Sequence, residues 1–269
     1  MFWKHYDIDS LDNVDFDRIE TYYRYLHGPL ERYFRSEVRG LHRIPRGAGL
    51  YVANHSGGII TPDSFIFGCA LYREQPREDL PYGLGHDVIN WPVVNQIVGP
   101  IGAVRASHAN AHRIFAAGKK VLVYPGGDVD NMRPWRHRYR IVFGGRTGYV
   151  RLALRESVPI IPVVSAGGHN TFIVIDDLRW LARLLRVDKL IRSHVWPLVL
   201  SIPWGLTVGV IPVYIPWPAK ILMEVGRPIT FARTGPDAAA DGTYVRLCAD
   251  EVEDTLQRML DRLAAELRR

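Results

Sequence analysis

Short apolar runs alternate with longer amphipathic segments along most of this chain. Apolar runs of strand length predict buried strands at 49–53, 81–86, 101–105, 120–124, 159–164 and 221–225. Segments of helical length lie between them, at 63–73, 90–98, 108–117, 147–156 and 177–193. Strands that alternate with helices of this size predict an α/β fold, with a mixed, largely parallel central sheet flanked by helices.

Long helical patterns are expected near both ends of the chain. Residues 14–38 carry aromatic and aliphatic side chains at helical spacing, although the Gly28-Pro29 pair should break or kink this helix. Residues 243–268 form a strongly amphipathic pattern with one apolar stripe. We therefore expect an N-terminal helical element and a C-terminal amphipathic helix that packs on the α/β body.

The composition is that of a folded protein that attracts anions. The 269 residues, 47% of them hydrophobic, can bury a full core, which we expect to divide into an N-terminal helical element (1–40) and an α/β domain (41–269). The net charge of +6 favours phosphates or an anionic membrane surface. No repeated module mixes basic and aromatic residues, so nucleic acid is not an expected partner. The histidines and cysteines have no metal-binding spacing, so no metal is expected.

A long apolar segment raises the question of a membrane. Residues 195–219 contain no charge and are long enough to cross a hydrocarbon core of ~30 Å as a helix. Repeated prolines, each costing a helix interior ~3 kcal/mol, argue against a spanning helix. A hairpin or loop that dips into the membrane interface, an apolar wall of a lipid groove and an ordinary buried segment remain open. The basic amphipathic pattern at 177–193 predicts a membrane-surface anchor, or a helix packed on the core by its leucines.

Candidate chemistry gathers where predicted strands end. The run 49–53 ends in the sequence NHSGG, which contains His55, and Asp63 lies at the start of the next helix. Arg105 follows a second strand, and Gly126-Gly127 follow a third. Because ligands gather at the carboxyl ends of such strands, we expect these residues to converge on one pocket. A histidine oriented by a carboxylate can act as a general base, whereas the alternative is that His55 only caps a turn.

Several motifs occur together in an order that resembles the glycerolipid acyltransferase superfamily. They are NHSGG with a downstream Asp, GAVR, VYPGG, GGRTGYVRLAL and VPIIPVV, and the likeness covers roughly residues 35–232. The closest branch is that of mono- and diacylglycerol acyltransferases. The resemblance implies the α/β lysophospholipid acyltransferase fold and transfer of a fatty acyl group from a thioester to a glycerolipid hydroxyl. Acyl-CoA or acyl-carrier protein would be the co-substrate, and no further cofactor is implied.

The resemblance also assigns roles to single residues. His55 stands at the family's histidine, and Asp63 is the nearest acid, since Ile60 fills the usual slot four residues on. Arg105 matches a basic residue tied to phosphate or acceptor binding. Gly126 replaces the glutamate of the common Pro-Glu-Gly, as in the diacylglycerol branch, which weakens the case for lysophosphatidic acid as the acceptor.

These assignments predict a single displacement in which His55 deprotonates the acceptor hydroxyl and Asp63 binds the other ring nitrogen. Ser56 as a covalent nucleophile is disfavoured because the Gly-x-Ser-x-Gly pattern is absent. Amides of Gly57-Gly58 or Gly126-Gly127 are candidate oxyanion donors, or simple turns. Arg146 is the arginine best suited to donor phosphates or a lipid head group.

The same pocket leaves two other functions open. A thioesterase would use water in place of the acceptor, and a lipid-binding protein would keep the pocket without catalysis. For the enzyme we expect a peripheral or monotopic position on the cytoplasmic side of a membrane.

Overall fold

The computed structural model describes residues 4–85, 87–187, 189 and 194–269. Its centre is a seven-stranded sheet with the order β1-β10-β6-β2-β5-β3-β4. The strands are β1 (Glu37–Arg39), β2 (Gly49–Ala53), β3 (Tyr82–Gly85), β4 (Ala103–Arg105), β5 (Lys120–Val123), β6 (Ile160–Ala166) and β10 (Leu222–Val225). All neighbours pair in parallel except β10 and β6, which are antiparallel. The predicted fold class, mixed and largely parallel with flanking helices, is confirmed.

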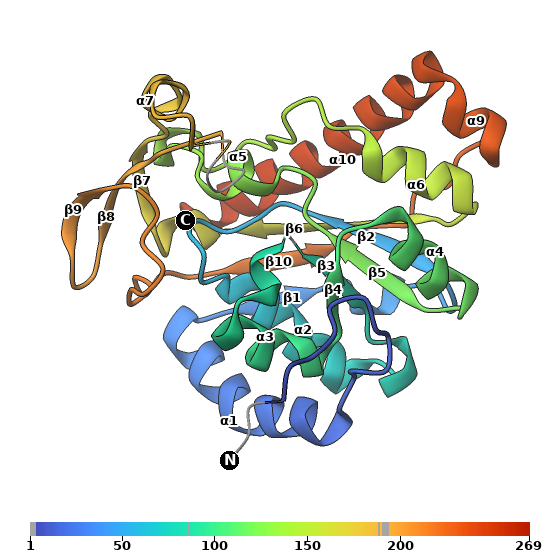
Figure 1. Ribbon diagram of the computed structural model, residues 1–269, viewed down its shortest axis with the longest axis horizontal. Helices are drawn as coiled ribbons and strands as arrows, with labels where there is room; N and C mark the ends of the chain where they lie inside the picture. The colour runs from blue at the N-terminus through green and yellow to red at the C-terminus, as the bar shows by residue number, and fades with distance from the viewer. Residues whose placement is uncertain (1–3, 86, 188, 190–193) are drawn as a thin grey trace.

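Helices cover both faces of this sheet (Figure 1). One face carries α1 (Phe16–Phe34), α2 (Pro62–Glu74) and α3 (Pro92–Val98). The other carries α4 (His108–Ala116), α6 (Gly148–Glu156), the short α9 (Pro236–Ala240) and α10 (Gly242–Leu267). The central strand β2 explains why its sequence is apolar throughout. Leu50 and Val52 pack with α4, α6 and α10, whereas Tyr51 and Ala53 pack with α2, so both faces are buried.

The N-terminal helix differs from its prediction. α1 continues through Gly28-Pro29 without a break, although Pro29 cannot donate a backbone hydrogen bond. The turn before the proline lies near solvent, where Tyr25 is 69% exposed, so water can satisfy the carbonyl that loses its partner. Exposure therefore makes the proline tolerable.

The basic helix predicted over 177–193 also differs from the helix observed there. α7 covers only Arg179–Leu184, between residues with a left-handed backbone, Leu178 (φ 41°) and Arg186 (φ 51°). The part of the prediction that falls on residues 188 and 190–193 lies outside the described residues.

The apolar segment 195–219 forms part of a second sheet that the sequence did not predict. This sheet has the order β7-β8-β9 and is antiparallel, with β7 (Ile173–Asp176), β8 (Leu198–Ser201) and β9 (Gly205–Val208). Its inner side covers a small core that includes Phe172, Val199 and Tyr214. Part of the segment thus forms a β-hairpin, β8-β9, and its contact with a membrane interface stays a prediction. No helix in the described part of the chain has the length and apolar character needed to span a membrane.

Candidate active site

His55 lies directly after β2, at the carboxyl end of the central strand, with its ring on the wall of an apolar cavity. Its backbone N–H donates to Oδ2 of Asp130 at 2.5 Å. The ring stacks on Tyr124, which follows β5, with 4.2 Å between ring centroids and 24° between planes. Nδ1 of His55 is buried and has no hydrogen-bond partner. The imidazole is therefore held by its backbone and by stacking, and its Nδ1 is left without a hydrogen bond.

Asp63 lies in the first turn of α2 and is fully buried. Its Oδ1 accepts hydrogen bonds from the Ser56 hydroxyl at 2.7 Å and from the Ser64 amide at 2.9 Å. Its Oδ2 has no partner. The predicted bond between His55 and Asp63 is thus not formed by Nδ1 or Oδ2 in this structure, and the catalytic role of Asp63 stays a prediction. Ser56 is itself fully buried and bound to this carboxylate.

A buried ion pair lies behind the histidine. Arg133 and Asp130 are both almost fully buried and contact each other through Arg133 Nη1 and Asp130 Oδ1. Burial raises the pKa of Asp130 to about 6, although the neighbouring Arg133 opposes this rise. Neither residue was among those predicted from the sequence. Asp130 lies in the short helix α5 (Gly127–Asn131) and Arg133 follows the end of that helix, so their spacing of three residues was a weak signal.

These surroundings control the protonation of the candidate base. Burial and the positive charge of Arg133 lower the pKa of His55 to about 4. The imidazole is therefore neutral at physiological pH, the form that a general base requires. Burial also raises the pKa of Asp63 to about 6, and hydrogen bonds from Ser56 and Ser64 limit that rise. The pKa of the deeply buried His169 falls well below its usual value for the same reasons as His55.

The cavity beside His55 has a volume of about 670 Å³. Its walls are mostly apolar and come from α1, α2, β3, β4 and β5, with Tyr22, Leu26, Leu84 and Leu122 among them. Polar residues on the wall of the cavity include His55, Thr61, Ser64, Asp128, Asn131 and Arg146. A largely apolar pocket with a few convergent polar groups is the usual form of a site for a small, mostly hydrophobic ligand.

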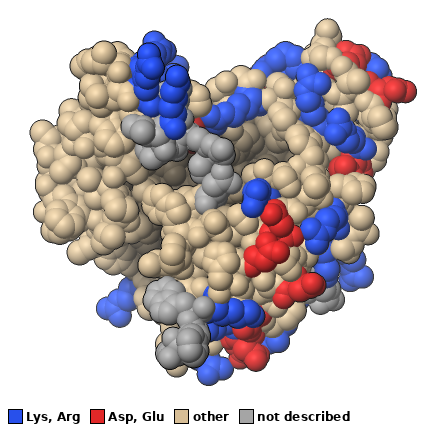
Figure 2. Space-filling view, viewed as in Figure 1, with Lys and Arg blue, Asp and Glu red and all other residues tan. Residues whose placement is uncertain are grey.

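A second cavity, of about 580 Å³, is strongly basic and shares Arg146 with the first. It is lined by Val129, Gly144, Arg146, Arg179, Ala182, Arg183, Arg186, Lys189 and His194. Figure 2 shows blue side chains gathered over α7, which supplies several of these residues. From the predicted anchor, Arg179, Arg183, Arg186 and Lys189 thus line a pocket. Trp180 and Leu184 on the short helix α7 are 64% and 72% exposed.

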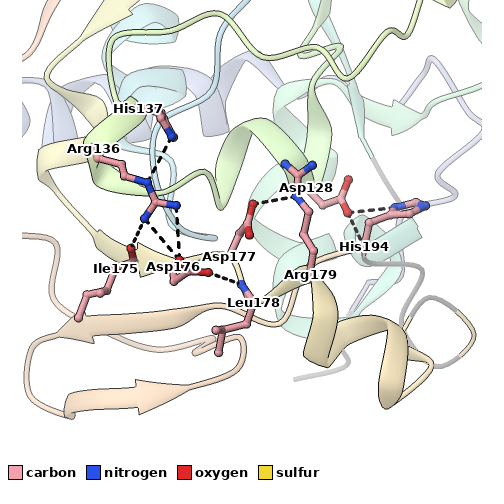
Figure 3. A network of polar contacts seen from close by, with 9 residues as sticks. All are labelled: Asp128, Arg136, His137, Ile175, Asp176, Asp177, Leu178, Arg179 and His194. Carbon is pink, nitrogen blue, oxygen red and sulfur yellow. Dashed lines mark hydrogen bonds and ion pairs between the residues drawn. The ribbon is translucent and has the colours of Figure 1, made fainter.

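Arg146 connects the two cavities to the VYPGG loop. It donates to the carbonyl of Pro125 at 3.1 Å, to that of Gly126, and to Oδ1 of Asp128 at 2.9 Å. Oδ2 of Asp128 accepts from the backbone N–H of His194 at 2.7 Å, which ties the segment after α7 to the same loop (Figure 3). Arg179 is held nearby by Asp177 at 2.8 Å. One arginine therefore fixes the loop and lies on the walls of both cavities.

The predicted glycines fit tight places around the histidine. A Cβ on Gly126 would lie 2.5 Å from the Val142 carbonyl oxygen, and one on Gly58 (φ 81°) would lie 2.1 Å from the Tyr214 hydroxyl. Two of the candidate oxyanion donors already have acceptors, since the Gly58 amide donates to the Asn131 carbonyl and the Gly127 amide to the Tyr124 carbonyl. At Gly57, a Cβ would crowd the carbonyl of Phe172.

Arg105 lies apart from the other predicted residues. Its side chain is 48% exposed and pairs with Asp9 at 3.1 Å, and it lies on the wall of neither cavity. The structure thus brings together His55, Asp63, Ser56, both glycine pairs and Arg146, but not Arg105. Its part in substrate binding stays a prediction.

Comparisons with known proteins identify similar sequences and a similar fold. Residues 35–166 match the family model described as Acyltransferase. An uncharacterised protein of Mycobacterium tuberculosis is 32% identical over 235 residues, 87% of this chain and 63% of its own length. The mouse protein described as "DGAT1/2-independent enzyme synthesizing storage lipids" is 23% identical, over 84% of this chain and 60% of its own length. The chain therefore spans about three fifths of these relatives.

A solved structure has a similar fold. The crystal structure of the 1-acyl-sn-glycerophosphate (LPA) acyltransferase, PlsC, from Thermotoga maritima superposes with a TM-score of 0.51. The sequences are 16% identical, and the match covers 91% of this chain and 83% of the other. Residues 35–166 thus resemble the acyltransferase family in sequence, and the fold of the chain is similar to that of a solved acyltransferase.

Proposed function

We propose that this protein is an O-acyltransferase that moves a fatty acyl group from an acyl thioester to a hydroxyl of a glycerolipid or a related lipid alcohol. The observation that carries the proposal is a neutral His55, with a pKa lowered to about 4, on the wall of an apolar cavity of about 670 Å³. The cavity suits an acyl chain and the histidine suits deprotonation of an alcohol.

The reaction is a single displacement. His55 accepts the proton of the acceptor hydroxyl while its oxygen forms a bond to the thioester carbonyl carbon. The tetrahedral intermediate then expels the thiolate by cleavage of the C–S bond, and the imidazolium returns its proton to that sulfur. Asp63 steadies the imidazolium by its negative charge once its carboxyl is ionised. Ser56 is committed to Asp63 by its hydroxyl, so no covalent enzyme intermediate is required.

The basic cavity is the proposed site for the phosphates of the donor. Arg183, Arg186 and Lys189 line it without a side-chain partner among the described residues, and Arg146 links it to the apolar cavity. Arginine and lysine are the usual ligands of phosphate groups. The density of cations favours coenzyme A, which carries several phosphate charges, over the single phosphodiester of a carrier protein.

The acceptor is proposed to reside in a bilayer. The enzyme would then work as a peripheral or monotopic protein on the cytoplasmic side of a membrane. The net charge of +6 suits an anionic surface.

The decisive experiment incubates purified protein with radiolabelled acyl-coenzyme A and a panel of lipid alcohols, followed by product identification and thiol measurement. The proposal predicts a labelled ester and thiol release that depends on the acceptor. Thiol release without any acceptor, and with free fatty acid as product, would identify a thioesterase. Bound lipid with no turnover would identify a binding protein.

A further inference from the structure

The small sheet presents an apolar face to solvent. Because Leu200 pairs with both Ile173 and Leu206, and Leu198 pairs with Val208, these side chains point to one side of the sheet. Most of the outer face consists of Ile173, Leu198, Leu200, Leu206 and Val208, which we call the apolar sheet face. Asp176 pairs with Leu198 at the edge of this face, and its carboxylate binds Arg136. Leu206 is 62% exposed and Val208 is 51% exposed.

The other side of the same sheet is already occupied. Val174 and Val199 are buried in the core cluster that contains Phe172 and Tyr214. An antiparallel sheet with one face on the core normally alternates apolar with polar residues, so that the outer face is hydrated. Here the outer face is apolar apart from Asp176 at its edge, which indicates that this face meets another apolar phase.

Neighbouring residues extend this surface. Trp204, in the turn between β8 and β9, is 56% exposed, and Val213 and Ile215 in the following segment are 69% and 53% exposed. No charged residue occurs between positions 195 and 219. The sheet projects at one end of the molecule (Figure 1), and the lobe there carries no Lys, Arg, Asp or Glu colour in Figure 2.

We propose that the apolar sheet face is the surface on which this protein docks on an anionic lipid bilayer. This proposal rests on the proposed function in one respect, namely that the acceptor would come from that bilayer. The charge of the molecule favours lipid over a protein partner. The net charge is +6, and α7, which begins shortly after β7, carries Arg179 and Arg183 beside this lobe. The exposed Trp180 and Leu184 of α7 are also suited to an interface.

The sheet geometry limits the depth of insertion. β7 and β9 are edge strands, and their unpaired backbone groups cannot enter hydrocarbon without a large penalty. The face therefore lies flat at the boundary of head groups and acyl chains, where amphipathic surfaces insert by roughly 5–10 Å. Trp204 fits this depth, because its indole N–H already donates to the Val213 carbonyl at 2.5 Å and its ring remains free for the interface.

This surface is joined to the loop that carries His55. The Tyr214 hydroxyl, from beneath the small sheet, accepts from the Ile60 amide at 2.9 Å and lies 3.1 Å from the Ile60 carbonyl oxygen. Ile59, the adjacent residue, lines the apolar cavity. Through Tyr214, the docking surface is therefore connected to the loop that lines the acyl cavity, which the lipid acceptor of the proposed reaction would enter.

The test is co-sedimentation with phosphatidylcholine vesicles that contain or lack phosphatidylglycerol. We compare the wild type with Leu206→Asp and Val208→Asp. Leu247→Asp is the matched control, because Leu247 is 65% exposed on α10, outside this sheet. The proposal predicts that wild type and control bind alike, more strongly with phosphatidylglycerol. Each sheet variant should weaken binding by at least about tenfold, as expected for the loss of one buried leucine or valine contact.

Three results would overturn the proposal. They are a wild type that fails to bind either vesicle, sheet variants that bind as well as the wild type, and a wild-type dimer in solution that the sheet variants dissociate. Circular dichroism and thermal melts establish that each variant is folded. The assay requires no acyl transfer, so its outcome is independent of the proposed reaction.

Discussion

The hydroxyl of Ser56 donates to Oδ1 of Asp63 across 2.7 Å, so the serine next to the candidate base binds the carboxylate that the sequence assigned to that base. Both residues are fully buried. We predict that Ser56→Ala lowers the free energy of unfolding by roughly 1–3 kcal/mol, the cost of leaving a buried acceptor without one donor. Turnover should stay within about fivefold of the wild type, because the serine forms no bond to the acyl group. Urea titration and a steady-state transfer assay measure the two effects.

A serine nucleophile would give the opposite result. Removal of that serine should then lower turnover by several powers of ten. After rapid mixing of the wild type with acyl-coenzyme A, intact-mass spectra should also show an acyl group on the protein.

The pH profile should have two acid-side steps. As the pH falls through about 6, Asp63 takes up a proton and loses the charge that steadies the imidazolium, so the rate decreases. As the pH falls further through about 4, His55 becomes protonated and the remaining rate disappears. The Asp63→Asn variant should be slower than the wild type and should lack the step near pH 6. Its rate should therefore stay constant from pH 8 to about pH 5. Measurements of kcat/KM with a water-soluble short-chain thioester test this.

An acid limb near pH 6.5 that persists in Asp63→Asn would contradict the assignment, since it would indicate an unperturbed histidine. Far-ultraviolet circular dichroism at each pH controls for unfolding.

The basic cavity should act on the donor's phosphates. Arg186→Ala and Lys189→Ala should each raise KM for acyl-coenzyme A by about 3–10-fold with little change in kcat, since each removes one exposed charge contact. The same variants should leave the KM for an acyl-pantetheine, which has no phosphate, unchanged. Arg24→Ala is the control, because Arg24 is an exposed arginine that pairs with Glu20 on α1. Equal effects on both donors would contradict a phosphate site.

Two glycines make a matched pair for stability. Gly58→Ala combines a left-handed backbone with a clash against the Tyr214 hydroxyl, and should lower the free energy of unfolding by at least about 2 kcal/mol. Gly68 lies inside α2 with open space around its Cβ position. Gly68→Ala should therefore raise the free energy of unfolding by up to about 1 kcal/mol. Denaturant titration measures both. Similar free energies of unfolding for the two variants would mean that the backbone and packing at Gly58 do not require a glycine.

The sequence predicted the parts of the molecule that local pattern determines. The central strands, β2 above all, are apolar on both faces because helices cover both, and such runs are easily recognised. The small sheet escaped prediction because its strands are short and β8 and β9 lie among prolines in a segment without polar alternation. α7 is shorter than its basic pattern suggested, because left-handed residues bound it.

The sequence predicted most of the residues of the candidate site but not their side-chain contacts. His55 and the glycine loops follow from strand ends, which topology alone brings together. The partner of Asp63, the Asp130–Arg133 pair behind the histidine and the pairing of Arg105 with Asp9 depend on side-chain packing between distant segments. Sequence spacing carries no information about such contacts in a single chain.

The central claim is that the imidazole of His55 is the base for acyl transfer, and His55→Ala tests it most directly. His112→Ala is the control, because His112 is a surface histidine that pairs with Glu156 away from the cavities. With acyl-coenzyme A and the best lipid alcohol from the panel, we predict that His55→Ala folds as the wild type does and loses about 10²–10⁴ of the rate, whereas His112→Ala keeps it. A folded His55→Ala protein that retains more than about a tenth of the rate would contradict the account.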